Sequence, residues 1–215
     1  MNSVGIIGAG QMGAGIAQVS AAAGYRVFMS DVSLEVAEKA KADIGKRLSR
    51  LVEKEKMEAK AAETALGRIE PVGSFEPMAS AGLIIEAATE REEVKRTIFG
   101  EVGKVLGHKA VLASNTSSIP ITRLAQASPD PERFIGVHFF NPVPVMDLIE
   151  VIKGLATSAE TVETVRGYGK ALGKQMVFAN DAPGFIVNRI LLPMLNEACF
   201  ALGEGVASIE DIDTA

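Results

Sequence analysis

The sequence SVGIIGAGQMG, from Ser3 to Gly13, decides the fold of this chain. A short apolar run with β-branched members is followed by three glycines spaced as G-x-G-x-x-G and by a helical pattern of small residues that reaches Ala23. Gly24 then ends the helix, and residues 25–30 form a second strand. This order of strand, glycine turn, helix and strand predicts a parallel α/β sheet that opens with a dinucleotide-binding unit.

Each glycine of the turn has a physical use. Gly8 permits the tight turn, Gly10 lets the backbone approach a pyrophosphate, and Gly13 lets the helix lie close to the strand. Asp31 follows the second strand, where a carboxylate accepts hydrogen bonds from a ribose and disfavours a 2′-phosphate. We therefore expect NAD rather than NADP. The alternative is a glycine-rich turn that binds nothing.

Beyond this unit, strands alternate with helices until about residue 180. Strands are expected at 82–87, 110–113, 133–137, 148–152 and 175–178, and helices at 89–105, after Pro120 and at 162–172. A charged helical stretch at about 35–66 has one apolar stripe, which predicts a helical arm. The fold class is α/β: a mostly parallel Rossmann-type sheet with a helical arm, at residues 1–182.

The alternation stops at residues 180–184, and Phe185 to Gly203 forms one long apolar helix. Residues 183–215 therefore begin an all-α C-terminal domain. Ser208 is a helix cap with acidic residues in the following turn, and the sequence stops soon after it. Because this helix has barely begun, we expect the chain to be truncated within its second domain.

The segment HFFNPVPVMDLIE, from His138 to Glu150, is the main candidate for chemistry. Its apolar, proline-punctuated pattern predicts strand, turn and strand, which brings the first and last residues side by side. Our hypothesis is a proton-transfer site, with His138 as acid/base and Glu150 orienting it. The alternative is a sheet-edge histidine with no chemistry. The other histidine, His108, lies in a polar turn and is interpreted as solvated surface.

Two polar stretches have open interpretations. The turn at Ser114 to Ser118 follows a strand where ligands bind in parallel sheets, but its side chains also suit turn formation and capping. Basic residues on the arm fit a solvated helix face or a contact with an anionic substrate tail. These residues are Lys46, Arg47, Arg50, Lys54, Lys56 and Lys60.

Composition excludes several classes of protein. The 215 residues are 47% hydrophobic and 23% charged, which is typical of a globular protein, and the net charge of -5 makes nucleic acid an unlikely partner. The single cysteine, Cys199, excludes an intrachain disulfide and a CxxC metal cluster, and we expect no metal. No apolar run reaches the ~18 residues of a membrane span, so we expect a cytoplasmic protein without a membrane partner.

Four motifs carry a family resemblance: GAGQMG at 8–13, SNTSS at 114–118, HFFNPVPVMDLIEV at 138–151 and DAPGFIVNRILLP at 181–193. Together they resemble the short-chain L-3-hydroxyacyl-CoA dehydrogenase family, especially its bacterial 3-hydroxybutyryl-CoA dehydrogenases. The resemblance implies that His138 is the general base and Glu150 its partner. It also implies that Ser117 hydrogen-bonds the substrate oxygen and that Asn188 is a fourth active-site residue, with both contacting the substrate.

The same resemblance implies a cofactor and a substrate. Family contacts to NAD fall on Gly8, Ala9, Gly10, Gln11, Met12, Gly13, Asp31, Glu90, Lys95, Ser117 and Asn141. On the arm, Lys54 matches a basic position that contacts coenzyme A, whereas Arg47 stands where a relative can have a serine. Relatives continue through further helices that pair two subunits, so a homodimer is expected when the C-terminal domain is complete.

The expected function is hydride transfer between NAD(H) and a 3-hydroxyacyl-CoA/3-oxoacyl-CoA pair of short chain length. One alternative is another NAD-dependent hydroxy-acid dehydrogenase on the same fold; relatives of the 3-hydroxyisobutyrate type use a lysine as acid/base, and the HFFNP segment argues against them. The other alternative is an NAD-binding module without turnover in this truncated form.

Overall fold

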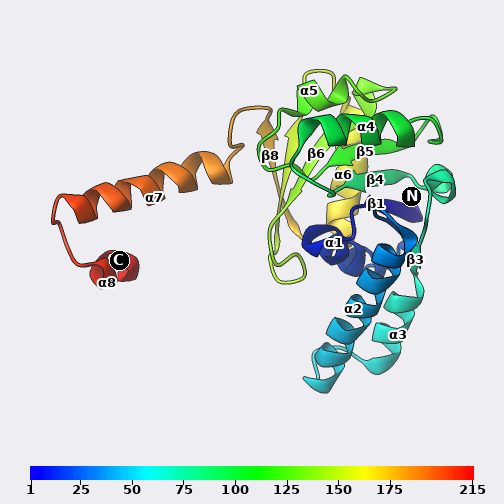
Figure 1. The fold of residues 1–215 in the computed structure, drawn as a ribbon, viewed down its shortest axis with the longest axis horizontal. Helices are drawn as coiled ribbons and strands as arrows, with labels where there is room; N and C mark the ends of the chain where they lie inside the picture. Colours follow the sequence, from blue (N-terminus) through cyan, green and yellow to red (C-terminus); the bar gives the residue numbers. More distant parts are fainter.

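The computed structural model describes residues 1–215 and contains one eight-stranded sheet with helices on both faces (Figure 1). The strands, in the order β3-β2-β1-β4-β5-β6-β7-β8 across the sheet, are β1 (Ser3–Ile7), β2 (Arg26–Ser30), β3 (Ile69–Pro71), β4 (Leu83–Glu86), β5 (Val111–Ser114), β6 (Phe134–Phe139), β7 (Leu148–Lys153) and β8 (Gln175–Asn180). Neighbours are parallel except for β6 and β7, which are antiparallel. The expected fold class is confirmed.

The helices follow the strands as crossover connections. They are α1 (Gln11–Ala22), α2 (Leu34–Glu53), α3 (Ala59–Gly67), α4 (Glu92–Val102), α5 (Ile121–Ala125), α6 (Ala159–Ala171), α7 (Val187–Gly203) and α8 (Ile209–Thr214), with short 3-10 helices η1 (Glu76–Ser80) and η2 (Pro131–Arg133). None of them combines the length and apolar character that crossing a lipid bilayer requires.

Two hydrophobic cores lie on opposite faces of the sheet. One gathers residues of α1, α2, α3 and α6 against the strands and includes Ile16, Ile44 and Tyr168. The other packs η1, α4 and α5 against the opposite face and includes Met78 and Phe99. Because both faces are covered, the central strands are apolar along their whole length rather than alternating.

The position of β1 creates the place where a ligand can bind. It lies between β2 and β4, so the chain crosses to opposite sides of β1 in its first and later connections. At such a switch point the loops after the strands diverge and leave a crevice at the carboxyl edge of the sheet. The glycine turn, Asp31 and the acid Glu86 all stand at this edge.

Several expected boundaries were wrong for identifiable reasons. The strand β3 was missed because it has three residues and contains Pro71, which is tolerated only at a sheet edge. The helix expected at 89–105 begins at Glu92, since the side chain of Glu90 bonds the 116–118 turn instead. His138 lies within β6 rather than after it.

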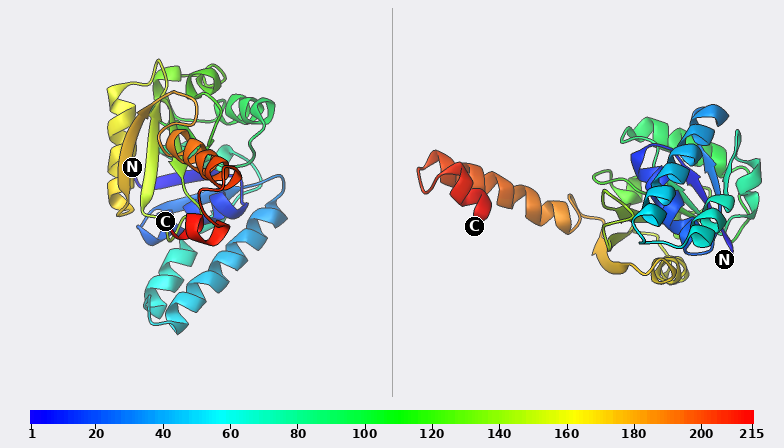
Figure 2. Two further views of the ribbon diagram at one scale, coloured as in Figure 1. Left: turned by 90° about the vertical axis from the view of Figure 1, so that its left-hand side faces the viewer. Right: turned by 90° about the horizontal axis from the view of Figure 1, so that it is seen from below.

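Two helical segments project from the α/β body (Figures 1 and 2). The arm is a hairpin of α2 and α3, whose turn contains Glu55 with a positive φ of 54°. In Figure 1 the arm extends downward, whereas α7 leads away from the sheet to the left and carries α8 at its end. Its large apolar side chains, including Ile190, Leu192 and Leu195, are exposed.

Candidate active site

The glycine turn has the space that a pyrophosphate needs. A Cβ atom on Gly13 would lie 1.8 Å from the carbonyl oxygen of Gly8, so only glycine permits α1 to lie this close to the strand. Gly8 has a φ of +101°, whereas a Cβ on Gly10 would meet no atom within 4 Å. No side chain caps the N-terminus of α1. Its first amides therefore face open space, as anion binding requires.

Asp31 is joined to the glycine turn. One carboxylate oxygen accepts a hydrogen bond from the amide of Ala9, and the other accepts one from Val32 at 2.7 Å. Each oxygen keeps a further lone pair, so the carboxylate can still accept hydrogen bonds from a ribose. The residues at this end of the crevice fit the adenosine half of a dinucleotide.

His138 and Glu150 face each other on the antiparallel pair of β6 and β7. Their side chains form a hydrogen bond of 2.8 Å between Nδ1 and Oε2, and neither side chain is more than 8% exposed. Phe140 and Phe185 pack against the imidazole ring with centroids 4.6 and 5.9 Å away. These rings exclude water around the pair, which strengthens its electrostatic interaction.

The second oxygen of Glu150 holds the start of α7. Oε1 accepts hydrogen bonds of 2.9 Å from the amides of Ile186 and Val187. A corner at Gly184 and Phe185, both with positive φ, turns the chain so that these amides point at the carboxylate. The negative charge lies at a helix N-terminus, where the helix dipole stabilises it. Glu150 therefore links the sheet to the helix that carries Asn188.

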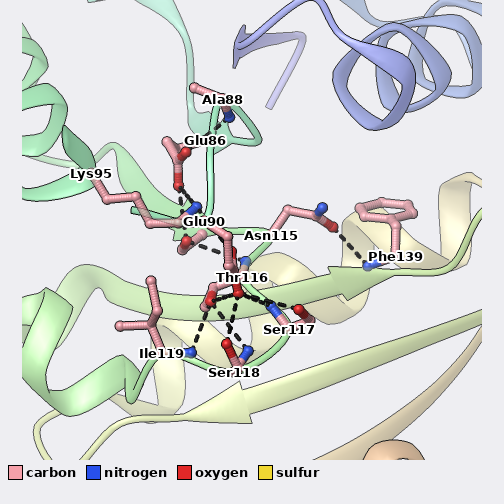
Figure 3. A network of polar contacts seen from close by, with 11 residues as sticks. Glu86, Ala88, Glu90, Lys95, Asn115, Thr116, Ser117, Ser118, Ile119 and Phe139 are labelled. Carbon is pink, nitrogen blue, oxygen red and sulfur yellow. Dashed lines mark hydrogen bonds and ion pairs between the residues drawn. The ribbon is translucent and has the colours of Figure 1, made fainter. Parts of the chain in front are cut away.

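The hydroxyl-rich turn after β5 is held by Glu90. Its Oε1 atom accepts hydrogen bonds from Thr116 and Ser118 and from both the amide and the hydroxyl of Ser117 (Figure 3). Burial alone would raise the pKa of Glu90, but these hydrogen bonds and the charge of Lys95 lower it on balance. The carboxylate is therefore ionised and acts only as a hydrogen-bond acceptor.

The two interpretations of this turn, turn formation and a place at the ligand site, apply to different residues of it. The hydroxyl of Thr116 accepts from the amides of Ser118 and Ile119 and forms the turn. Asn115 accepts from the amide of Phe139 at 2.8 Å, which ties the turn to β6. Ser117 faces the cavity, and its carbonyl accepts a hydrogen bond of 3.4 Å from Asn188.

A cavity of about 510 Å³ brings His138, Ser117 and Asn188 together with several of the residues expected to contact NAD. It is lined by Met12, Ala87, Ala88, Thr89, Glu90, Lys95, Asn115, Ser117, His138, Phe139, Phe140, Asn141 and Asn188. Glu150 lies behind His138. The other residues of the glycine turn and Asp31 lie outside this lining, toward β2.

Sequence reasoning missed Glu86, which lies fully buried beneath the cavity. It ends an apolar strand at the carboxyl edge of the sheet, as Asp31 follows β2, and that shared signal could have identified it. Asn115 was considered only as part of the polar turn.

The arm residues lie apart from this cavity. Lys54 is exposed at the C-terminus of α2. Arg47 lies at a second cavity of about 290 Å³, formed by α1, α2 and residues 141–145. Its Nε atom donates to Gln18 at 3.0 Å, while its Nη2 atom is buried without a partner. Desolvation lowers the pKa of Arg47, and the charge of Asp43 opposes that shift.

Comparison with known proteins identifies relatives along the whole chain. The model for the 3-hydroxyacyl-CoA dehydrogenase NAD binding domain matches residues 3–182, and that for the C-terminal domain matches residues 184–215. A 3-hydroxybutyryl-CoA dehydrogenase of Bradyrhizobium diazoefficiens is 50% identical over all 215 residues, which span 73% of that relative. The mitochondrial hydroxyacyl-coenzyme A dehydrogenase of Homo sapiens is 44% identical over 99% of this chain and 69% of its own.

A solved structure gives the same result in three dimensions. The crystal structure of (S)-3-hydroxybutyryl-CoA dehydrogenase from Ralstonia eutropha matches with a TM-score of 0.95 and 46% identity, over 98% of this chain and 75% of that one.

Proposed function

We propose a mechanism from the premise that the chain belongs to the 3-hydroxyacyl-CoA dehydrogenase family. It is an NAD-dependent oxidoreductase, which transfers a hydride between NAD(H) and a 3-hydroxyacyl-CoA/3-oxoacyl-CoA pair. The short-chain pair 3-hydroxybutyryl-CoA and acetoacetyl-CoA suits it best, because relatives with this name are about half identical to it. The observation that carries the mechanism is the buried hydrogen bond between His138 and Glu150 at the cavity.

His138 moves the proton in this mechanism. Its Nδ1–H donates to Glu150, which leaves the lone pair of Nε2 free of protein partners to take the hydroxyl proton of the substrate. Glu150 stabilises the imidazolium that forms. Bound NAD supplies the acceptor for the hydride. In the reductive direction, His138 returns the proton to the substrate oxygen.

Ser117 and Asn188 hold that oxygen as its charge changes. The Ser117 hydroxyl donates to Glu90 at 3.2 Å, the longest of four hydrogen bonds on one carboxylate oxygen. This hydrogen bond is therefore the most easily broken. The Ser117 hydroxyl can then turn to a substrate oxygen, while the amide of Ser117 stays bonded to Glu90. The amide group of Asn188 lies beside it. Such donors stabilise an alkoxide-like transition state.

The direct test is consumption of NADH with acetoacetyl-CoA. Free hydroxy acids and sugar acids, assayed in their oxo forms, serve as parallel substrates, because they lack the coenzyme A portion. Turnover of acetoacetyl-CoA well above the others is expected. A preference for a free acid would overturn the proposed substrate class.

The carboxylate of Asp31 is expected to decide the choice of cofactor. In an Asp31→Ser variant, NADH loses a hydrogen-bond acceptor for its ribose, and NADPH no longer meets a negative charge at its 2′-phosphate. The ratio of the dissociation constant of NADPH to that of NADH should fall by roughly tenfold or more. Fluorescence titration with each cofactor measures it, and an unchanged ratio would contradict this role.

Arg47 and Lys54 are the arm residues that we propose for coenzyme A. Arg47 lines the second cavity, and its Nη2 atom has no hydrogen-bond partner within the protein. A guanidinium with unused donors can bind a phosphate in a bidentate geometry. Lys54 offers a solvated charge farther along the arm.

Arg47→Gln is expected to raise the KM for acetoacetyl-CoA by about tenfold, because a hydrogen bond to a charged group contributes about 1.5–3 kcal/mol. The dissociation constant of NADH should stay within about twofold of the parent value. Lys54→Gln tests the second residue, and Lys60→Gln removes an equal charge from the arm as a control. Equal KM values for Arg47→Gln and Lys60→Gln would exclude Arg47.

We also propose how the chain is organised. Residues 1–182 form the NAD-binding domain, with the arm at about 35–66, and residues 183–215 begin the helical domain. The exposed apolar residues of α7 favour a homodimer. A cytoplasmic location suits the exposed thiol of Cys199, which stays reduced there.

A further inference from the structure

Glu86 is a buried acid to which the mechanism so far gives no role. It is the last residue of β4 and is 0% exposed. A carboxylate in such a position requires partners, because losing its hydration is costly. Three groups provide them: the hydroxyl of Ser114 at 2.9 Å, the amide of Ala88 at 2.9 Å and the ammonium of Lys95 at 2.6 Å. Figure 3 shows the contacts of Ala88 and Lys95.

Lys95 brings its ammonium group from α4 to the wall of the cavity. The side chain is only 1% exposed, yet Lys95 lines the cavity together with His138 and Ser117. Two acids face its Nζ atom: Glu86 from β4 at 2.6 Å and Glu90 from the following turn at 3.7 Å. The shorter contact, with the fully buried acid, fixes where the charge stands.

A purely structural role explains this ion pair poorly. A buried pair of charges gives little net stability compared with apolar side chains of similar size. The pair also sits at the carboxyl edge of the sheet, where Glu86 ends β4 and Lys95 lines the cavity. Its position indicates that the ammonium is needed at the cavity wall.

We infer that Glu86 is a positioning residue for the cofactor. It holds the Lys95 ammonium at the cavity wall and keeps it from moving onto Glu90. This inference rests on the proposed function and on the family resemblance, which implies that Lys95 contacts NAD. Without Glu86, the ammonium either moves toward Glu90, whose Oε2 atom lies 3.7 Å away, or gives up its proton.

The test begins with Glu86→Gln, which keeps the size of the side chain and an acceptor oxygen but removes the charge. The dissociation constant for NADH, measured by fluorescence titration, should rise by about tenfold. The loss should increase as the pH rises above neutrality, since an ammonium that keeps only the more distant acid, Glu90 at 3.7 Å, releases its proton more readily. A structural role alone would not create this pH dependence.

Thr161→Val is the matched control. Thr161 is equally buried and donates to the carbonyl of Glu132 at 2.8 Å, but it lies in α6, away from the cavity. Its loss should lower the melting temperature and leave the dissociation constant for NADH unchanged at every pH.

A second pair of variants keeps the test decisive if Glu86→Gln does not fold. Lys95→Met leaves Glu86 as an unpaired acid, whereas Lys95→Met combined with Glu86→Gln removes both charges. If Glu86 acts through Lys95, the double variant binds NADH at least as tightly as Lys95→Met. Weaker binding by the double variant would overturn the inference, because Glu86 would then act without Lys95.

The remaining outcomes are also clear. A folded Glu86→Gln protein with the parental dissociation constant and pH profile overturns the inference, whatever the catalytic result. If the parent binds NADH but does not reduce acetoacetyl-CoA, the proposed substrate fails, while the comparison of dissociation constants still decides the role of Glu86.

Discussion

A His138→Gln variant is expected to turn over acetoacetyl-CoA about 10²- to 10⁴-fold more slowly than the parent, the usual contribution of a general acid/base. Glutamine has no titratable nitrogen to take the place of Nε2, so the proton must come from water. The dissociation constant of NADH should be nearly unchanged, because the cofactor-binding turn and Asp31 stand on other strands. Steady-state turnover and NADH titration separate the two effects.

His108→Gln is the natural control, since His108 is the only other histidine. It lies in the Gly107–Lys109 turn, outside the cavity that His138 lines. Parental turnover is expected. Equal turnover in His138→Gln and the parent would eliminate the proton-transfer role.

Glu150→Gln is expected to cost about 10⁴-fold in turnover, the loss seen when a histidine beside a carboxylate is left in the wrong tautomer. The structure dictates the orientation of the new side chain. Two backbone amides donate to Oε1, so the oxygen of the carboxamide must stay there. Its NH₂ group then points at Nδ1 of His138, which must accept, and the ring proton moves to Nε2. The base has lost its lone pair.

Two further measurements isolate this effect. Glu150→Gln keeps the acceptor for the start of α7, so its melting temperature should stay near that of the parent. Glu150→Ala loses this acceptor as well and should be clearly less stable, because two partly buried amides lose their partner. If the pH-rate profiles of Glu150→Gln and the parent superimpose, the pairing with His138 has no part in catalysis.

Much of the fold can be predicted from the sequence, because the signals for it lie within short stretches of residues. The glycine spacing from Gly8 to Gly13 fixes a turn, and the apolar strands are recognisable because both sheet faces are covered. The antiparallel contact of His138 with Glu150 also follows from one short strand, turn and strand. Boundaries failed where distant residues decide, as at Glu90, whose partners lie 26–28 residues away.

By itself, the sequence determined the sheet, the cofactor turn, the candidate dyad and, through its motifs, the family. Only the tertiary structure decided the contacts around the dyad. These are the hydrogen bond of Glu150 with the start of α7, the hydrogen bond of Glu90 with Ser117, and the ion pair of Glu86 with Lys95. The reason is physical. These contacts join side chains to groups on other elements, and their geometry depends on how the strands and helices pack, which no short stretch of sequence records.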